Sequence, residues 1–197
     1  WPAELYAAFE HHDADEHALP DALDEVGYSV EDIDAVVQSH LHLDHAGSLH
    51  RFAGTEVPIY VHEKEIKYAY YSAKTDEESA AYVPADFDHD LNWQIIHGES
   101  ETHFEDLELL HLPGHTPGLM GMRIDLDGYG TVVFTGDLAY TRANYFEEHP
   151  LGGDLLWSKR HWYESIHRVQ EIERQTDADI YCGHDPDDVE QLRGGLP

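Results

Sequence analysis

The chain has 197 residues, of which 41 are acidic and 11 are basic, so its formal net charge at pH 7 is −30. This length suits one domain with a substantial core, and a hydrophobic fraction of 41% excludes compositional disorder. The acidity argues against nucleic acid or an anionic membrane as a partner, because both require a cationic surface. No apolar run is long enough to span a membrane.

The acidic residues are spread along the whole chain rather than gathered in a tail. Dispersed acidity with little lysine is typical of a halophilic protein from a high-salt cytoplasm, where salt screens the self-repulsion. An ordinary acidic protein is the alternative. The single cysteine, Cys182, permits no internal disulfide, which fits a reducing, cytoplasmic location.

In the first half of the chain, helix and strand signals surround one histidine-rich segment. Residues 1–27 are expected to be helical, with Gly27 at the helix end. The run AVVQSH predicts a short strand at 35–40, which leads into SHLHLDHAG. A second strand is expected at 57–63 and a helix at 64–74, followed by an acidic, irregular surface excursion at 75–100.

The second half reads mainly as strands. The expected elements are a strand running into a Pro-Gly turn at 107–115, a hairpin of 119–126 and 131–137, a helix at 157–176 and a strand at 178–184. No repeat or linker divides the chain, so a single domain over residues 1–197 is predicted.

Residues able to bind metal recur where predicted strands end. His40, His115, Asp137 and His184 each lie just past an apolar run. The rim of a sheet collects side chains from distant parts of a chain in this way, and functional sites usually lie there. We therefore expect these four side chains to meet.

The segment SHLHLDHAG adds three more candidates, His42, Asp44 and His45. In an extended segment His40 and His42 face the same side and can bind one ion. Asp44 and His45 are neighbours whose side chains are expected to diverge, and they can serve a second ion. Imidazole and carboxylate without thiolate favour zinc, manganese, iron or cobalt. Cys182 is expected to belong to the core, and His62 and His111 are expected to serve packing or to support a ligand.

The pattern HxHxDH followed by single His, Asp and His resembles the metallo-β-lactamase superfamily. Three segments are similar to its N-acyl-homoserine lactonase branch: SHLHLDHAG, GDLAYT with Tyr140 three residues after Asp137, and CGHDPDDVEQLR. The resemblance implies an α+β fold, an αβ/βα sandwich with the metal site at one rim. It extends from about residue 30 to the end.

The resemblance also implies roles. His40, His42 and His115 would bind a first metal, and Asp44, His45 and His184 a second, with Asp137 shared between them. A hydroxide bridging two divalent ions, most simply Zn²⁺, would attack a lactone carbonyl. Tyr140 would hydrogen-bond the developing oxyanion, and Asp44 would pass a proton to the leaving alkoxide. From the residues alone, the acidic run DPDDVE is expected to be a solvated surface turn, in which only Asp185 is a candidate to support His184. The expected partner is a small lactone or ester, with a homodimer left open.

One departure from the family concerns the beginning of the chain. Members usually start with strands that lead to a DTG-like segment, and none precedes His40 here. Either the chain is an N-terminally truncated version or those strands are absent from it. An inactive metal-binding fragment therefore stays an alternative.

Two enzymes on the same fold are further alternatives. A glyoxalase II-like thioester hydrolase shares the ligand set but needs a basic patch for its substrate, and this chain has few cations. A redox diiron protein usually carries glutamate where His42 stands. Both features favour the lactonase.

Overall fold

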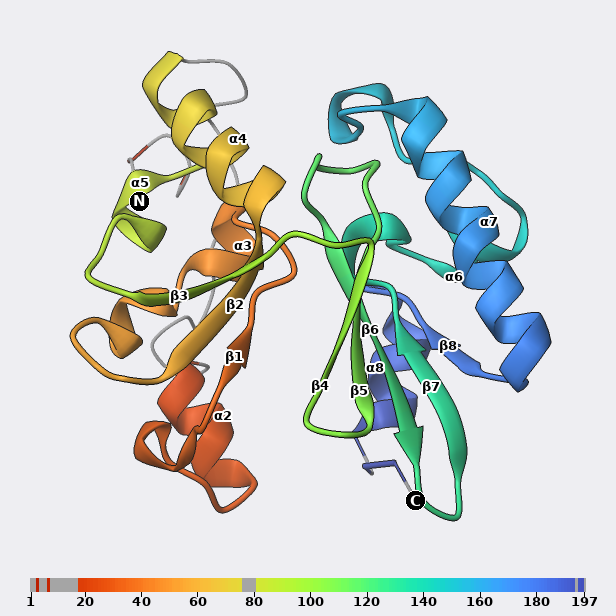
Figure 1. Cartoon of the computed structure of the whole chain (residues 1–197), viewed down its shortest axis with the longest axis horizontal. Coiled ribbons are helices and arrows are strands. Elements are labelled where there is room, and N and C mark those ends of the chain that lie inside the picture. The colour runs from red at the N-terminus through yellow and green to blue at the C-terminus, as the bar shows by residue number, and fades with distance from the viewer. Residues whose placement is uncertain (1–2, 4–6, 8–17, 76–80, 194, 197) are drawn as a thin grey trace. The chain divides into compact units, whose positions relative to one another are not determined.

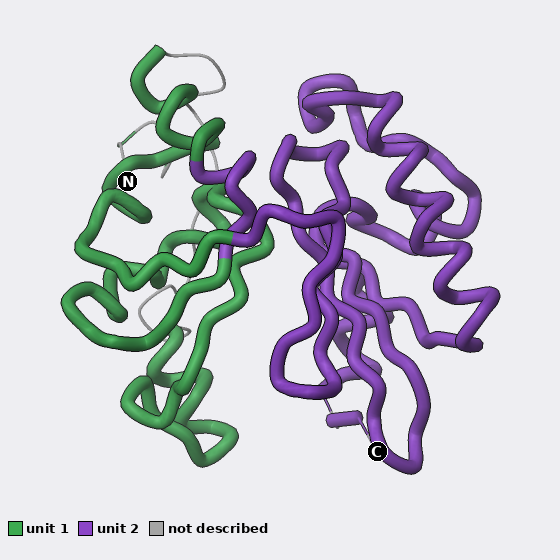
Figure 2. The backbone as a smooth tube through the Cα atoms, viewed as in Figure 1, with its two compact units in different colours: residues 1–60, 67–95 green, residues 61–66, 96–197 purple. Residues whose placement is uncertain are grey.

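The computed structural model describes residues 3, 7, 18–75, 81–193 and 195–196. The chain divides into two compact units (Figure 2). Unit 1 comprises residues 1–60 and 67–95, and unit 2 comprises residues 61–66 and 96–197. The single domain over residues 1–197 stays a prediction.

Unit 1 contains a small sheet with the strand order β1–β2–β3 (Figure 1). The strands are β1 (Val36–Val37), β2 (Pro58–His62), whose last two residues belong to unit 2, and β3 (Asn92–Ile96). β1 and β2 are parallel, with Val36 opposite Ile59. Parallel neighbours require a crossover, and here it carries SHLHLDHAG, helix α3 (Leu43–Ala46) and a 3-10 turn (Leu49–Phe52).

Helix α2 (Leu19–Glu25) precedes this sheet and is followed by a 3-10 turn (Val30–Asp32). Gly27 has a φ of +82°, the left-handed conformation that glycine adopts easily just past a helix end. The helix end expected there is confirmed. Residues 1–17 lie outside the described residues, apart from 3 and 7.

The expected surface excursion at 75–100 is wrong for its described part. Helix α5 (Pro84–Phe87) and strand β3 lie in this segment, and Tyr82, Val83, Phe87 and Leu91 are buried. The acidic residues here alternate with apolar ones, and the apolar side chains pack into unit 1. Overall acidity concealed that alternation.

Unit 2 contains a five-stranded sheet with the order β4–β5–β6–β7–β8 (Figure 1). Its strands are β4 (Ser100–His103), β5 (Leu107–His111), β6 (Met120–Leu126), β7 (Gly130–Phe134) and β8 (Asp179–Tyr181). The pairs β4–β5, β5–β6 and β6–β7 are antiparallel, and β7–β8 is parallel. The expected hairpin is confirmed as β6–β7, and Gly128 and Gly130 in its turn have positive φ.

The helices of unit 2 connect and cover these strands. They are the first turn of α4 (Glu63–Thr75), which continues into unit 1, and α6 (Arg142–Phe146), α7 (Lys159–Thr176) and α8 (Pro186–Leu192), with 3-10 turns at Gly136–Leu138 and Gly153–Leu155. None of the helices in the described ranges combines the length and the apolar character that crossing a bilayer requires.

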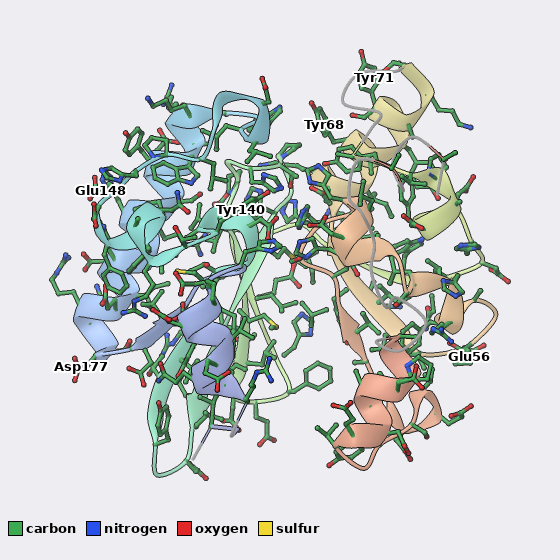
Figure 3. The ribbon with its side chains drawn as sticks, turned by 180° about the vertical axis from the view of Figure 1, so that it is seen from behind. Glu56, Tyr68, Tyr71, Tyr140, Glu148 and Asp177 are labelled. Carbon is green, nitrogen blue, oxygen red and sulfur yellow. The ribbon has the colours of Figure 1, made fainter. Side chains whose placement is uncertain are left out.

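The core of unit 2 lies between α7 and the sheet. Trp162, Ile166 and Val169 of α7 are fully buried and pack in one cluster with Val133 and Ile180. The expected helix at 157–176 is confirmed as α7, and Asp177, which follows its last residue, has a φ of +55°. Figure 3 labels Asp177 at this end of the helix. Trp162 also donates its indole N–H to the carbonyl of Leu138 at 2.6 Å, which fixes the turn after β7.

Candidate metal centre

In unit 1 the histidines of SHLHLDHAG form one cluster of rings. His42 is extended, with φ −67° and ψ 156°, and its ring centroid lies 4.7 Å from that of His40. The ring of His45 lies 4.2 Å from His40. His40 is fully buried. The expectation that His40 and His42 share a side is confirmed.

The expected divergence of Asp44 and His45 is wrong. The carboxylate Oδ2 of Asp44 lies 3.5 Å from Nε2 of His45. Both residues belong to helix α3, so they are not arranged as in an extended chain. The Asp44 side chain is half exposed, which leaves its carboxylate accessible to solvent.

Tyr82 also contacts this cluster and was not among the candidates. Its ring centroid lies 4.5 Å from that of His42, and it is 1% exposed. The N–H of Leu43 donates to the carbonyl of Ala81 at 2.9 Å, which ties the motif to the segment containing Tyr82. The run AYV, apolar within an acidic stretch, was the available signal.

In unit 2, Asp137 joins the other two predicted histidine ligands. Its Oδ2 lies 3.4 Å from Nε2 of His115, and its Oδ1 lies 3.3 Å from Nε2 of His184. Asp137 follows strand β7 and is buried. Gly183 permits this approach, because a Cβ there would lie 2.9 Å from the carbonyl oxygen of Gly136. The carboxylate therefore presents one oxygen to each imidazole.

The orientation of His115 is fixed by the loop before α7. Its Nδ1 donates to the carbonyl of Leu155 at 2.7 Å, and Nε2 is therefore the nitrogen that faces Asp137. The N–H of Trp157 donates to the carbonyl of His115 at 3.0 Å. A backbone carbonyl on the second ring nitrogen is the usual arrangement for a histidine that binds metal.

Tyr140 lies beside both histidines of this group. Its ring centroid is 4.7 Å from that of His184 and 5.7 Å from that of His115. It belongs to the connection between β7 and α6, where Figure 3 labels it. The structure thus brings Tyr140 to the histidines with which the sequence pattern associates it.

Cys182 and Asp185 both lie within two residues of His184. Burial raises the pKa of the Cys182 thiol to about 12, so it stays protonated, and its burial confirms the expected core position. Asp185 accepts the N–H of Arg142 at 2.8 Å and caps helix α8 through the N–H of Asp187. The Arg142 N–H holds the pKa of the Asp185 carboxyl below its usual range.

His62 and His111 are buried in unit 2, as expected. Their rings stack with centroids 3.9 Å apart and an interplanar angle of 3°. Burial lowers the pKa of His62 to about 4 and also lowers that of His111. Nε2 of His111 lies 3.0 Å from the carbonyl of Pro117, so the pair supports the loop that carries His115.

The donors on both units fit a divalent first-row metal. Unit 1 offers three imidazoles and a carboxylate, and unit 2 offers two imidazoles and a buried carboxylate. Such nitrogen and oxygen donors suit zinc, manganese, iron and cobalt.

A family model described as the metallo-beta-lactamase superfamily matches residues 6–184. Among similar proteins, an N-acyl homoserine lactonase from a Bacillus species is 35% identical over 180 residues, which cover 91% of this chain and 66% of that protein.

Solved structures agree with this match. The crystal structure of Bacillus thuringiensis AiiA, a mutant with N-decanoyl-L-homoserine at its active site, has a TM-score of 0.77 and 31% identity. An N-acyl homoserine lactone hydrolase with N-hexanoyl-L-homoserine at its catalytic metal centre gives the same two values. Each alignment covers 90% of this chain and 66% of the other.

The chain thus spans 66% of the length of these relatives. The family model covers most of the chain, and both sheets of the mixed α/β fold are present. The chain therefore belongs to the metallo-beta-lactamase superfamily and has its fold.

Proposed function

We propose that the protein is a metal-dependent hydrolase that opens the lactone ring of N-acyl homoserine lactones. The observation that carries the proposal is the buried carboxylate of Asp137, whose two oxygens lie 3.4 Å and 3.3 Å from the imidazoles of His115 and His184. A carboxylate so placed suits two neighbouring ions. The lactonase relatives support the choice of substrate.

The residues proposed to hold the metals are those of the sequence motif. His40, His42 and His115 would hold one ion, and Asp44, His45 and His184 the other, with Asp137 contacting both. We propose Zn²⁺, because imidazole and carboxylate donors suit it. When bound, a pair of divalent ions supplies an acidified water and polarises the substrate carbonyl.

The protein groups around the donors would orient the substrate and move protons. Tyr140, beside His115 and His184, would donate its phenol hydrogen bond to the lactone carbonyl as negative charge develops there. The half-exposed carboxylate of Asp44 would carry a proton to the departing alkoxide, which becomes the hydroxyl of the ring-opened acid.

We propose that the protein works in a high-salt cytoplasm. The net charge of −30 is spread along the chain, and concentrated salt screens the resulting self-repulsion. The purified chain should therefore be assayed in molar KCl.

The proposal is tested by following acid release from N-hexanoyl-homoserine lactone with Zn²⁺-loaded protein. Tyr140→Phe should lower kcat by at least about tenfold, as expected for loss of one oxyanion donor. Tyr28→Phe is the matched control, because Tyr28 is exposed in unit 1 and should leave kcat unchanged. Hydrolysis of a thioester but of no lactone would replace the proposal with a thioesterase, and Zn²⁺ binding without either turnover would contradict it.

A further inference from the structure

A buried carboxylate on helix α8 lies close to the turn that carries His184. Asp188 is 1% exposed, and both of its oxygens accept hydrogen bonds. Oδ1 accepts from the guanidinium of Arg142 at 2.8 Å, and Oδ2 accepts from the backbone N–H of Cys182 at 2.8 Å. One side chain therefore connects the residues that follow Tyr140 with those that precede His184.

Backbone hydrogen bonds join the same two turns directly. The N–H of Gly183 donates to the carbonyl of Ala139, and the N–H of His184 donates to the carbonyl of Tyr140, each at 2.9 Å. Asp185 adds a third link, because it accepts the backbone N–H of Arg142. The turn at 139–142 and the turn at 182–185 thus form one hydrogen-bonded assembly closed by the Arg142–Asp188 pair.

The environment of the pair makes it sensitive to substitution. Arg142 is 47% exposed and its guanidinium lies 4.6 Å from the centre of the Phe146 ring, whereas Asp188 is buried. Loss of the guanidinium would leave a buried carboxylate without its counter-charge, which costs more than the pair itself contributes. The Asp188 side chain would then move, and with it the N–H of Cys182 that it holds.

We propose that Arg142 and Asp188 are positioning residues for His184 and Tyr140. This inference rests on the proposed function, since it assigns a purpose to holding those two side chains. The imidazole of His184 is 41% exposed, so packing does not enclose it. Its placement relative to the Tyr140 ring, 4.7 Å away, depends on the joined turns. Supporting residues of this kind typically change metal affinity or activity by about 10–100-fold.

The test compares Arg142→Gln, Asp188→Asn and the double variant with wild type. Arg142→Gln removes the guanidinium but keeps the backbone N–H that donates to Asp185. Arg142→Lys restores a cation. Arg193→Gln is the matched control, because Arg193 forms an exposed pair with Glu190 at the end of α8, the helix that carries Asp188. Folding of each variant is checked by thermal unfolding, and Arg142, being half exposed, provides the test should Asp188→Asn not fold.

The first readout is the affinity of the full chain for Co²⁺, titrated spectroscopically. Arg142→Gln and Asp188→Asn should each bind the more weakly held Co²⁺ at least about tenfold less tightly than wild type. The double variant should bind Co²⁺ no more weakly than Asp188→Asn, because both substitutions remove the same Arg142–Asp188 interaction. Arg142→Lys should recover most of the affinity, and Arg193→Gln should match wild type.

The second readout is lactone turnover, in which the variants should lose kcat more than they raise KM. Folded variants with wild-type Co²⁺ affinity and kcat would overturn the inference while leaving the lactonase proposal intact. A wild type that binds Co²⁺ but opens no lactone would instead refute the proposed function, and the Co²⁺ affinities would still decide whether the pair positions His184.

Discussion

The hydroxyl of Thr116 donates a 2.6 Å hydrogen bond to the carboxylate of Glu65, which is completely buried. Glu65 lies in the first turn of helix α4, and Thr116 follows His115 directly. Gly118 lies against the backbone of the same turn of α4. The loop that carries His115 is therefore fixed to the beginning of a helix.

Thr116→Val should destabilise the fold by about 1–3 kcal/mol, because it keeps the side-chain shape but removes one hydrogen bond to a buried carboxylate. Denaturant unfolding measures the change. Thr131→Val is the matched control, since Thr131 donates a 2.7 Å hydrogen bond to the exposed carboxylate of Asp125. Equal losses in both variants would show that burial of Glu65 does not matter.

Gly118→Ala should destabilise the fold more than the addition of one methyl group normally does. A Cβ at Gly118 would lie 2.1 Å from the backbone nitrogen of Glu65, so helix and loop must separate. We expect a loss of about 3 kcal/mol or more in the free energy of unfolding. Gly153→Ala provides the comparison, because a Cβ there has no heavy atom within 4 Å. A Gly118→Ala protein as stable as Gly153→Ala would contradict the packing described.

His62 should make the stability of the fold depend on pH. Burial, reinforced by stacked His111, lowers its pKa to about 4, whereas an unfolded histidine titrates near 6.5. Between these values the unfolded chain binds a proton that the folded chain does not. The contribution to stability is therefore complete above about pH 6.5 and lost as the pH falls toward 4.

The comparison of wild type with His62→Gln isolates this effect from other titrating groups. Between pH 7 and pH 4, wild type should lose on the order of 2 kcal/mol more unfolding free energy than the variant. The charged groups near the stacked pair are Lys64, Glu63, Glu99 and Arg168, and they are the same in both proteins. Parallel pH profiles would show that His62 is not responsible.

The dispersed acidity predicts that KCl stabilises the fold. At a net charge of −30, the midpoint of thermal unfolding should rise between dilute buffer and molar KCl as screening reduces self-repulsion. An uncharged solute such as sucrose controls for stabilisation by exclusion from the protein surface. Equal midpoints in dilute buffer and in molar KCl would remove the argument for a high-salt setting.

The elements with strong local signals were predictable. The hairpin β6–β7 has glycines at the turn positions that need positive φ, and α7 shows helical spacing of its buried residues. β3 was missed because its segment is acidic overall, and only the positions of its apolar residues show that part of it is buried. Average polarity hides such alternation.

The candidate ligands were found because the motif is compact and each later ligand follows a strand. Their supporting groups were not found, since these act across the sequence. Glu65 meets Thr116, Arg142 meets Asp188, and the carbonyl of Leu155 fixes the ring of His115. Nothing in the local sequence of Arg142 or Asp188 distinguishes a surface charge from one half of a buried pair.

The most direct test of the account combines metal content and lactone turnover in the same samples. Wild type, His42→Ala and His184→Ala would be loaded with Zn²⁺ in molar KCl, with His149→Gln as the control, because the His149 side chain is exposed and lies outside the proposed ligand set. The account predicts about two Zn²⁺ per chain and ring opening in wild type and His149→Gln, with turnover lost in both ligand variants. Ring opening at the wild-type rate in either His42→Ala or His184→Ala would contradict it.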